Sequence, residues 1–375
     1  MKITPRSSLG AAVAAVFAVA FLGPRPAAAW SAHGHSTIGQ IAQDLLTKSA
    51  PSDPSAQAAL AGIAALMNAA SDPAYVLPPD ALAALAPCAD MVRVEPGEGS
   101  YPAVTPGEQV TCAGLTFTAE AASKDWHYVN IPISAPATAD SAAAYCPAGD
   151  CVVDEIKRAV SDLQTSTVLD DRRKSLMYLV HFVGDLHQPL HCATEIVCPP
   201  GIADKAKCKN DAGGNGKLVK FDGTTLKLHA LWDHLFEADD KSNDPAAISK
   251  ELEGELPADP SAWTSGDFVT DAAVESFSIA QGTIYPNYHQ LAAGGQTPAY
   301  SDADHDQMLS LIDGRLERGG VRLAALLKQA FSAGPAAGAS APAQAAPAAP
   351  ASANEARALD NSRHRVRRTE ASGAQ

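Results

Sequence analysis

The segment from His181 to His191 holds the densest set of chemically active side chains in the sequence. Three imidazoles and one carboxylate occur within it, and most of its other positions are apolar. His181 and Asp185 are four residues apart, so on a helix their side chains share one face. Pro189 cannot continue a helix, because it lacks an N–H group and its ring clashes with the preceding turn. The resulting bend could return His191 to the same site.

Imidazole and carboxylate groups are ligands that zinc prefers, so the segment predicts a metal site. The alternative is a core helix whose polar side chains are satisfied by hydrogen bonds. A second His-x3-Asp pair, His229 and Asp233, favours the metal site. Further candidate residues for the metal site lie far apart in the sequence, and they could act together only if the fold brings them close. They are His35, Asp90, Arg93 and His127.

The first 29 residues have the pattern of a cleaved secretory signal. Lys2 and Arg6 precede an apolar run from Leu9 to Leu22, and small residues follow at 27–29. The run is short for a membrane span, so we expect no membrane anchor. Cleavage after residue 29 would start the mature chain at Trp30. We therefore expect a secreted or periplasmic protein.

Seven cysteines agree with export, because an oxidising compartment favours disulfides over zinc thiolates. Cys146 with Cys151 and Cys198 with Cys208 are plausible pairs from their short separations. Sequence alone leaves the connectivity of the remaining cysteines open, and the odd count leaves one thiol unassigned.

The formal net charge of −14 is unevenly distributed. Residues 1–29 carry three basic groups and no acid, whereas residues 334–375 carry five arginines against three acids. The segment 30–333 is therefore more acidic than the chain as a whole. This charge argues against a broad basic groove for nucleic acid. An anionic substrate would need local positive charge, which bound metal ions can supply.

Apolar residues recur at helical intervals through most of the chain, and strand signals are sparse, so we expect a mainly α fold. Residues 30–333 would form one domain, with a β-hairpin between Gln109 and Phe117. Residues 334–353 are mostly Ala and Pro and predict a linker, and residues 354–375 predict a basic disordered tail. The predicted helices are 38–46, 55–70, 80–90, 152–165, 171–188, 229–238, 267–283 and 303–331.

Six motifs together give a strong resemblance from Trp30 through the last predicted helix. They are Trp-x4-His at the mature N-terminus, Ala-Asp-x2-Arg, Trp-His-Tyr, His-Phe-x-Gly-Asp-x-His-Gln-Pro-Leu-His, Gly-Gly-Asn and Leu-His-x2-Trp-Asp. The chain resembles the S1/P1 family of secreted zinc-dependent single-strand nucleases. Their mostly helical fold is shared with bacterial zinc phospholipases C, which makes a phospholipase C/P1 nuclease-like domain the expected architecture.

The resemblance implies three zinc ions. Ligands of the first ion would be Asp90, His127, His181 and Asp185. Ligands of the second would be His191, His229 and Asp233. The third would be held by His35, by Asp185 as a bridge, and by the α-amino and carbonyl groups of Trp30. Signal cleavage would then have a chemical role, because it frees the chelating amine.

The resemblance also implies hydrolysis of single-stranded DNA and RNA to 5′-phosphate products by a zinc-activated hydroxide, with 3′-nucleotidase activity. Asp90 and Arg93 are the predicted catalytic residues. Arg93 could contact the reacting phosphate, or it could form a salt bridge that orients Asp90; both readings stay open. We expect a monomer without a stable protein partner.

Three residues are predicted to bind the substrate. Tyr128 occupies the position at which relatives use an aromatic residue to stack on a base. Asn130 departs from the family, whose members carry Asp there; Asn adds an amide donor, which predicts a shifted base preference. Asn215 in Gly-Gly-Asn could contact the substrate or the metal cluster, or it could simply form a turn.

Two other functions fit parts of this pattern. A zinc phospholipase C can share His-x3-Asp-x5-His, but the short Trp-x4-His spacing, the second His-x3-Asp pair and Gly-Gly-Asn favour the nuclease. A non-catalytic exported protein that binds metal or nucleic acid is the other alternative. The complete set of expected ligands, together with Arg93, argues against it.

Overall fold

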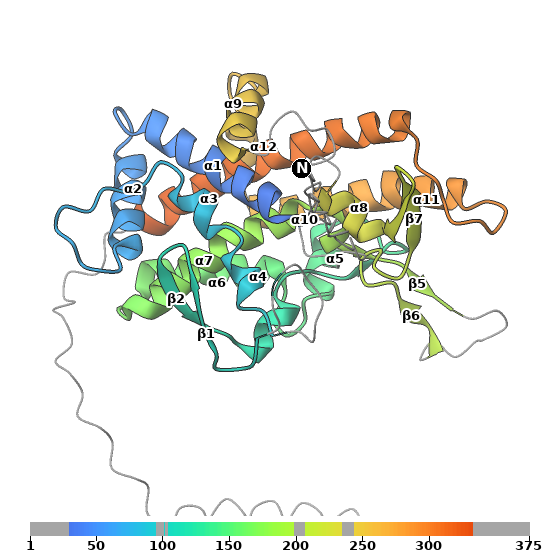
Figure 1. The fold of residues 1–375 in the computed structure, drawn as a ribbon, viewed down its shortest axis with the longest axis horizontal. Helices are drawn as coiled ribbons and strands as arrows, with labels where there is room; N and C mark the ends of the chain where they lie inside the picture. Colours follow the sequence, from blue (N-terminus) through green and yellow to red (C-terminus); the bar gives the residue numbers. More distant parts are fainter. Residues whose placement is uncertain (1–29, 95–100, 102–103, 199–206, 235–243, 333–375) are drawn as a thin grey trace, which may run out of the picture. The chain divides into compact units, whose positions relative to one another are not determined.

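Six long helices form the framework of the protein (Figure 1). The computed structural model describes residues 30–94, 101, 104–198, 207–234 and 244–332. The long helices are α1 (Ala32–Ser49), α2 (Pro54–Met67), α6 (Val152–Thr165), α7 (Leu169–His187), α10 (Phe268–Ile279) and α12 (Asp302–Ser332). The mainly α fold predicted from the sequence is confirmed.

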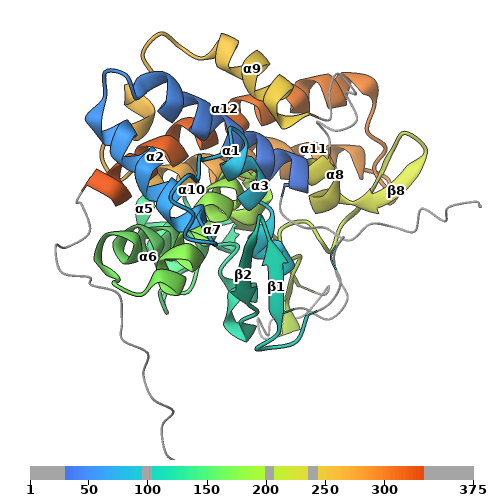
Figure 2. The ribbon, with the colours of Figure 1, turned by 60° about the vertical axis from the view of Figure 1, so that its left-hand side comes forward.

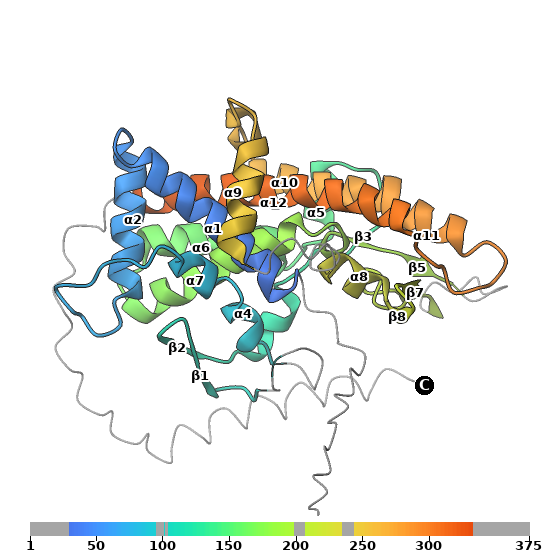
Figure 3. The same ribbon diagram turned by 45° about the horizontal axis from the view of Figure 1, so that its top comes forward.

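Helix α7 is the central element of the fold. All of its residues from Ser175 to His187 are buried, and it contacts α6, α12, α1 and α10. Figures 2 and 3 show it beneath the pair formed by α1 and α12. A helix that is buried all round must find partners for every polar side chain it carries. This requirement applies to His181, Asp185 and His187.

Helices α1 and α12 pack closely because glycine faces the crossing (Figure 2). A Cβ atom added at Gly320 would lie 2.3 Å from Cγ2 of Ile41, so no other residue fits without displacement. The close crossing fixes α1 over α7. It thereby positions His35, near the start of α1, over the buried end of α7.

Shorter helices and four strand pairs complete the fold. The helices are α3 (Ala81–Leu85), α4 (Cys88–Met91), α5 (Ala139–Ala144), α8 (Leu228–His234), α9 (Pro245–Glu255) and α11 (Tyr285–Leu291). Antiparallel pairs are β1 (Gln109–Cys112) with β2 (Leu115–Thr118), β5 (Ile196–Val197) with β6 (Lys209–Asn210), and β7 (Leu218–Phe221) with β8 (Thr224–Lys227). Strands β3 (Ile131–Pro132) and β4 (Ala193–Thr194) form a short parallel pair.

Most of the predicted elements agree with these bounds. The helix predicted at 152–165 matches α6, and the hairpin matches β1 and β2. The single helix predicted at 80–90 is wrong, because α3 ends at Leu85 and α4 starts at Cys88, with Pro87 between them. The helix predicted at 267–283 continues instead through a π turn, 280–284, into α11. Helices α5 and α9 were not predicted.

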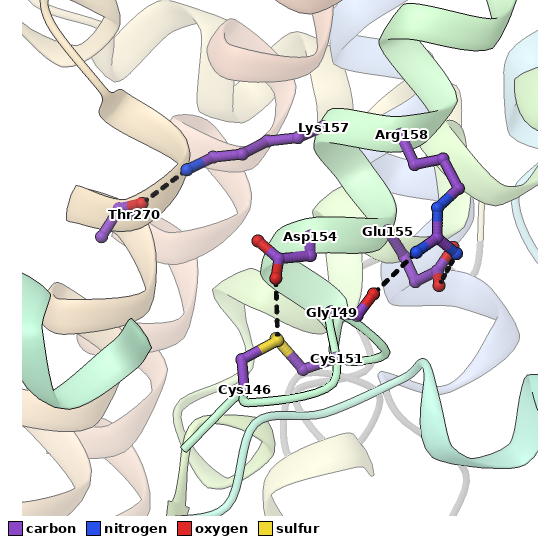
Figure 4. Close-up of a disulfide and its surroundings, with 8 residues drawn as sticks. All are labelled: Cys146, Gly149, Cys151, Asp154, Glu155, Lys157, Arg158 and Thr270. Carbon is purple, nitrogen blue, oxygen red and sulfur yellow. Dashed lines mark hydrogen bonds and ion pairs between the residues drawn. A yellow bond between two sulfur atoms is a disulfide. The ribbon is translucent and has the colours of Figure 1, made fainter. Parts of the chain in front are cut away.

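Three disulfides fix the irregular segments. Both predicted pairs are confirmed, and the third joins Cys88 to Cys112, linking α4 to the β1–β2 hairpin. Figure 4 shows the Cys146–Cys151 disulfide at the start of α6, where Oδ2 of Asp154 lies 3.2 Å from the Cys146 sulfur. Cys146, Cys151 and Asp154 lie close enough to suggest a metal site, but both sulfurs are in the disulfide, so no thiolate is available as a ligand. The unassigned thiol is Cys192, which is buried.

Several predictions concern residues outside the described ranges. They are the signal at 1–29, the linker at 334–353, the tail at 354–375 and the end of the helix predicted at 229–238. Within the described part of the chain, no helix combines the length and apolar character needed to cross a membrane.

Candidate metal centre

The end of α7 brings the opening His-rich segment to one buried place. His181 and Asp185 lie on the same inward face, and both are fully buried. The helix ends at His187, and Pro189–His191 forms a 3₁₀ turn. This bend returns His191 to the cluster, with its Nδ1 atom 3.7 Å from Oδ1 of Asp185. The predicted return of His191 is confirmed as a matter of geometry.

The first group consists of Asp90, His127, His181 and Asp185. Nδ1 of His127 lies 2.9 Å from Oδ2 of Asp185 and 3.7 Å from Oδ1 of Asp90. Nε2 of His181 lies 3.3 Å from Oδ2 of Asp185 and 3.5 Å from Oδ1 of Asp90. The same Nε2 is 3.1 Å from Nδ1 of His127.

These separations fit a tetrahedral metal site. Four ligands about 2.0–2.2 Å from a zinc ion lie roughly 3.3–3.6 Å from one another. The five distances above scatter around that range. Donor atoms of His127, His181 and Asp185 lie within 4.8 Å of one another, as ligands of one divalent ion would. Asp90 lies within the same distance of His181 and His35.

The second group consists of His191, His229 and Asp233. Nε2 of His191 and Nε2 of His229 face each other at 3.1 Å, and Oδ2 of Asp233 is 3.8 Å from Nε2 of His229. Each histidine donates its Nδ1–H group to a backbone carbonyl at 2.7 Å, that of His127 or that of Gly213. A carbonyl only accepts, so Nδ1 carries the proton and Nε2 presents its lone pair. Two lone pairs directed at each other repel, and a cation between them would turn this repulsion into attraction.

His35 forms the third part of the cluster. Its ring stacks on that of His181 with centroids 3.9 Å apart, and its Nε2 lies 3.4 Å from Oδ1 of Asp185. Trp30 is fully buried, and the N–H of Ser31 donates to the carbonyl of Asp233 at 3.1 Å. The start of the described chain therefore lies beside the second group.

Gly184 is needed for this stacking. A Cβ atom at position 184 would lie 2.4 Å from Nδ1 of His35, which is closer than van der Waals contact permits. The glycine inside His-Phe-Val-Gly-Asp thus leaves the space that the His35 ring occupies. The sequence displays this glycine within the motif, but its partner on α1 became visible only in the fold.

Four of the five imidazoles in the cluster have protonation states that suit metal ligands. Burial lowers the pKa of His35, of His127 and of His191, and it lowers the pKa of His229 to about 4. These imidazoles are therefore neutral near pH 7, which is the form that coordinates metal. Burial lowers the pKa of the fifth, His181, but the carboxylates of Asp185 and Asp90 outweigh this effect and raise it to about 10. Burial raises the pKa of Asp185 to about 6, against the opposing effect of His181.

Buried polar atoms in the cluster also fit a cation. Among the described residues, neither ring nitrogen of His35 has a hydrogen-bond partner, and the same holds for Nε2 of His127 and Oδ1 of Asp185. Buried polar atoms in folded proteins nearly always have partners, because an unsatisfied one is costly. The donor set and its geometry show that these His/Asp groups could hold metal ions.

Arg93 lies beside the first group. It is partly buried, and its Nη2 donates to the carbonyl of Lys124 at 3.2 Å. Next to the effect of burial, the positive charge of Arg93 lowers the pKa of His127, so the guanidinium acts on the cluster electrostatically.

The predicted substrate residues Tyr128 and Asn130 lie on the segment that follows His127. Both are partly buried, and the Tyr128 hydroxyl donates to Oδ1 of Asp125 at 2.8 Å. Between them, the N–H of Val129 donates to the carbonyl of His191 at 2.8 Å. This bond ties the segment to the bend after α7.

The Gly-Gly-Asn motif orients His229. Gly213 has a φ of +61°, and a Cβ there would lie 2.3 Å from the carbonyl oxygen of Leu190. Only glycine lets the Gly213 carbonyl approach Nδ1 of His229 in this way. Asn215 donates from Nδ2 to the carbonyl of Ala212 at 2.9 Å, which is a turn contact.

One residue of the site was missed by the sequence reasoning. Gln188 is fully buried; its Nε2 donates to Oδ1 of Asp233 at 2.7 Å, and its Oε1 accepts from the N–H of Leu190. It thereby joins the bend after α7 to α8. The signal was its place in His-Gln-Pro-Leu-His, but its partner lies on a distant helix.

Known nucleases are similar to parts of this chain. Nuclease P1 from Penicillium citrinum is 26% identical over 199 residues, covering 48% of this chain and 66% of that protein. Endonuclease 5 from Arabidopsis thaliana is 30% identical over 175 residues, covering 43% of this chain and 52% of that protein. Nuclease S1 from Aspergillus oryzae is 29% identical over 112 residues, covering 30% of this chain and 34% of that protein. The chain spans about half the length of the curated relatives it matches.

The sequence model of one family, described as S1/P1 Nuclease, matches residues 30–332. The match runs from Trp30 to the end of α12 and includes every residue of the clustered groups. The chain therefore belongs to the S1/P1 nuclease family.

Proposed function

We propose that this protein is a secreted zinc-dependent phosphodiesterase that hydrolyses single-stranded DNA and RNA to 5′-phosphate products. We further propose that it removes terminal 3′-phosphates from nucleotides. The observation that carries the proposal is the clustering of His127 with His181 and Asp185, and of His191 with His229 and Asp233, inside a region that matches a nuclease family. His35 faces Asp185 from α1. The relatives are named nucleases and endonucleases, which supports the same class.

Three zinc ions are the proposed cofactors, assigned to ligands as the resemblance implies. One would be held by Asp90, His127, His181 and Asp185, and a second by His191, His229 and Asp233. The third would be held by His35, the second oxygen of Asp185 and the N-terminus at Trp30. Bound zinc would supply positive charge that polarises a phosphodiester and lowers the pKa of a water molecule.

Two residues of the chain have proposed roles in the reaction itself. The side chain of Asp90 is 8% exposed, whereas that of Asp185 is fully buried. Asp90 is therefore the carboxylate of the first group that a bound substrate could reach, which fits its proposed catalytic role. Arg93 lies beside it and would contribute a charge-assisted contact to the phosphate as negative charge develops.

Substrate recognition would depend on the segment after His127. Tyr128 would stack on a base, which tolerates any sequence because every base has an aromatic face. Asn130 would hydrogen-bond the base edge through an acceptor and a donor. Asn215 is assigned to the same substrate surface, with its side-chain amide already engaged in the turn.

The remaining assignments follow the same proposal. Residues 1–29 would be removed on export, which would free the amine of Trp30, and residues 30–333 would be the catalytic domain. Three disulfides fit the oxidising compartment that export implies. The enzyme would act as a monomer.

One assay separates this function from its alternatives. The purified mature protein is incubated with single-stranded DNA, RNA and phosphatidylcholine, with and without a chelator. Release of 5′-mononucleotides that the chelator abolishes supports the nuclease. Release of choline phosphate alone would indicate a phospholipase C, and no hydrolysis would indicate a binding protein. His229→Ala should lose activity, whereas the exposed His289→Ala should keep it.

A further inference from the structure

A charged cluster with two buried arginines and a partly exposed glutamate lies behind the bend after α7, outside the proposed ligand groups. It consists of Glu275 and Ser276 on α10 and of Arg315 and Arg322 on α12, and we name it the arginine clamp. Both arginines are only 3% exposed. Arginine is rarely buried unless it is paired, so two buried guanidinium groups in one cluster indicate a specific structural task.

Arg315, together with Ser276, supplies hydrogen bonds to the last backbone carbonyls of α7. Its Nε donates to the carbonyl of His187 at 3.2 Å, and its Nη2 donates to Oγ of Ser276 at 2.7 Å. Ser276 in turn donates to the carbonyl of Leu186 at 2.6 Å. The last carbonyls of a helix have no partner within it and carry partial negative charge. Here the guanidinium of Arg315 and the hydroxyl of Ser276 donate to these carbonyls.

Glu275 holds the two arginines in place. Nη1 of Arg315 donates to Oε2 of Glu275 at 2.7 Å, and Arg322 binds both carboxylate oxygens at 2.8 and 2.7 Å. A bidentate pair of this kind fixes orientation as well as distance. The clamp is therefore rigid relative to α10 and α12.

Arg322 also fixes His187. The Nδ1–H of His187 donates to the carbonyl of Val183 at 2.7 Å, which leaves Nε2 as an acceptor. Nη1 of Arg322 lies 3.0 Å from that Nε2 and donates to it. His187 thus acts as a neutral link between α7 and the clamp, which accounts for the third imidazole of the opening segment.

The far side of the bend touches the same elements. Cys192 follows His191 directly, is fully buried, and has its sulfur 3.6 Å from the carbonyl of Leu186. The 3₁₀ turn Pro189–His191 packs against α10. Asp185 lies before the bend and His191 after it, so the geometry of the bend sets the spacing between the first and second groups.

We infer that Arg315 is a positioning residue for the second metal group. By fixing the end of α7, the arginine clamp places His191 against His229 while Asp185 remains directed at His127. Loss of the guanidinium would remove the donor to the His187 carbonyl and the group that holds Ser276, whose hydroxyl donates to the Leu186 carbonyl. The turn that carries His191 would then loosen. Residues that orient metal ligands typically contribute roughly 10–100-fold to metal affinity. This inference rests on the proposed metal-binding function.

The test measures zinc release, not catalysis. The mature, zinc-loaded protein is titrated with a chromophoric chelator, which resolves the ions by affinity. His229→Ala identifies the release phase that belongs to the second group. Arg315→Ala should shift that phase to roughly 10–100-fold weaker binding and leave the others nearly unchanged. Added guanidinium should restore it, and equal concentrations of sodium chloride should not.

Arg318→Ala is the matched control. Arg318 also pairs with Glu275, at 3.3 Å, but its side chain is 36% exposed, and among the described residues it makes no hydrogen bond or ion pair with α7. It should leave every release phase unchanged. If Arg315→Ala does not fold, Arg315→Lys serves instead, because it keeps the positive charge and loses the planar guanidinium with its several N–H donors.

Two results would overturn the inference. One is an unchanged second-group phase in a folded Arg315 variant. The other is an equal shift of all phases, which would mean general destabilisation without specific positioning. Failure of the proposed function is distinguishable, because the wild-type protein would then show no release phase that His229→Ala removes.

Discussion

Oδ1 of the Asp185 carboxylate lies 3.4 Å from Nε2 of His35, which is on α1 at the start of the domain sequence. Its other oxygen, Oδ2, lies 2.9 Å from Nδ1 of His127. One carboxylate thus faces two separate sets of nitrogen donors. This is the arrangement expected of a ligand that bridges two metal ions.

Replacing Asp185 tests the bridge. Asp185→Ala removes both oxygens at once, so we expect the protein to lose more than one zinc ion per molecule, as measured by elemental analysis after gel filtration. The matched control is Asp171→Ala, in the first turn of the same helix and exposed to solvent. Loss of less than one zinc from Asp185→Ala would show that the carboxylate does not bridge.

Gly184→Ala tests the packing of His35. The added methyl group would meet Nδ1 of His35 at 2.4 Å, and overpacking of this kind costs about 1–3 kcal/mol. We expect a lower melting temperature and the loss of one zinc ion, that of the His35 site. Gly314→Ala on α12 is the control, because nothing lies within 4 Å of its added Cβ. It should not lower the melting temperature, since alanine favours a helix. A Gly184→Ala protein that retains its full zinc content would contradict the role given to His35.

Asn130→Asp tests base recognition. The amide can both donate and accept, whereas the carboxylate only accepts, so the variant should rank the four bases differently. The measurement compares rates on the four 3′-mononucleotides and on homopolymeric single strands. Activity should persist in the variant, because the proposed stacking of Tyr128 on the base would be retained. An unchanged ranking would remove Asn130 from the recognition surface.

Glu155→Gln tests a pH effect away from the metal centre. Burial raises the pKa of Glu155 from 4.5 to about 7, although its partner Arg158 lowers it in part. The folded state therefore binds this proton more tightly than the unfolded state, and stability is lost as pH rises through 7. Glutamine cannot ionise and avoids that loss. We expect similar melting temperatures at pH 5 and a relative gain for the variant at pH 8.

The control for this comparison is Glu251→Gln, at an exposed position on α9. It should show no change with pH relative to the wild type. A constant difference between Glu155→Gln and the wild type from pH 5 to pH 8 would mean that the carboxyl titrates at its ordinary pKa.

The sequence predicted the helices that carry strong periodicity and the residues that form dense motifs. The periodicity of apolar residues in α6 predicted its bounds. The His181–His191 segment predicted both the spacing of its ligand residues and the bend at Pro189. Such features are local, because the side chains that act together are close in the chain. Helix α9 was missed because its amphipathic pattern is weak and only Ser249 and Leu252 on it are buried.

The residues that orient the site were less visible. Gln188, Gly184 and Arg315 have partners on helices distant in sequence, so their roles depend on packing that no single motif records. Only the resemblance to the nuclease family predicted that Asp90, His127 and His35 join the ligands on α7. Spacing alone could not have collected them.

The most direct test of the central claim is a zinc titration that follows hydrolysis. The mature protein is freed of metal with a chelator, and zinc is added in fractions of an equivalent while the release of 5′-mononucleotides from single-stranded DNA is recorded. We predict that activity reaches its plateau at three equivalents of zinc. Full activity with less than two equivalents, or hydrolysis that persists in excess chelator, would contradict the account.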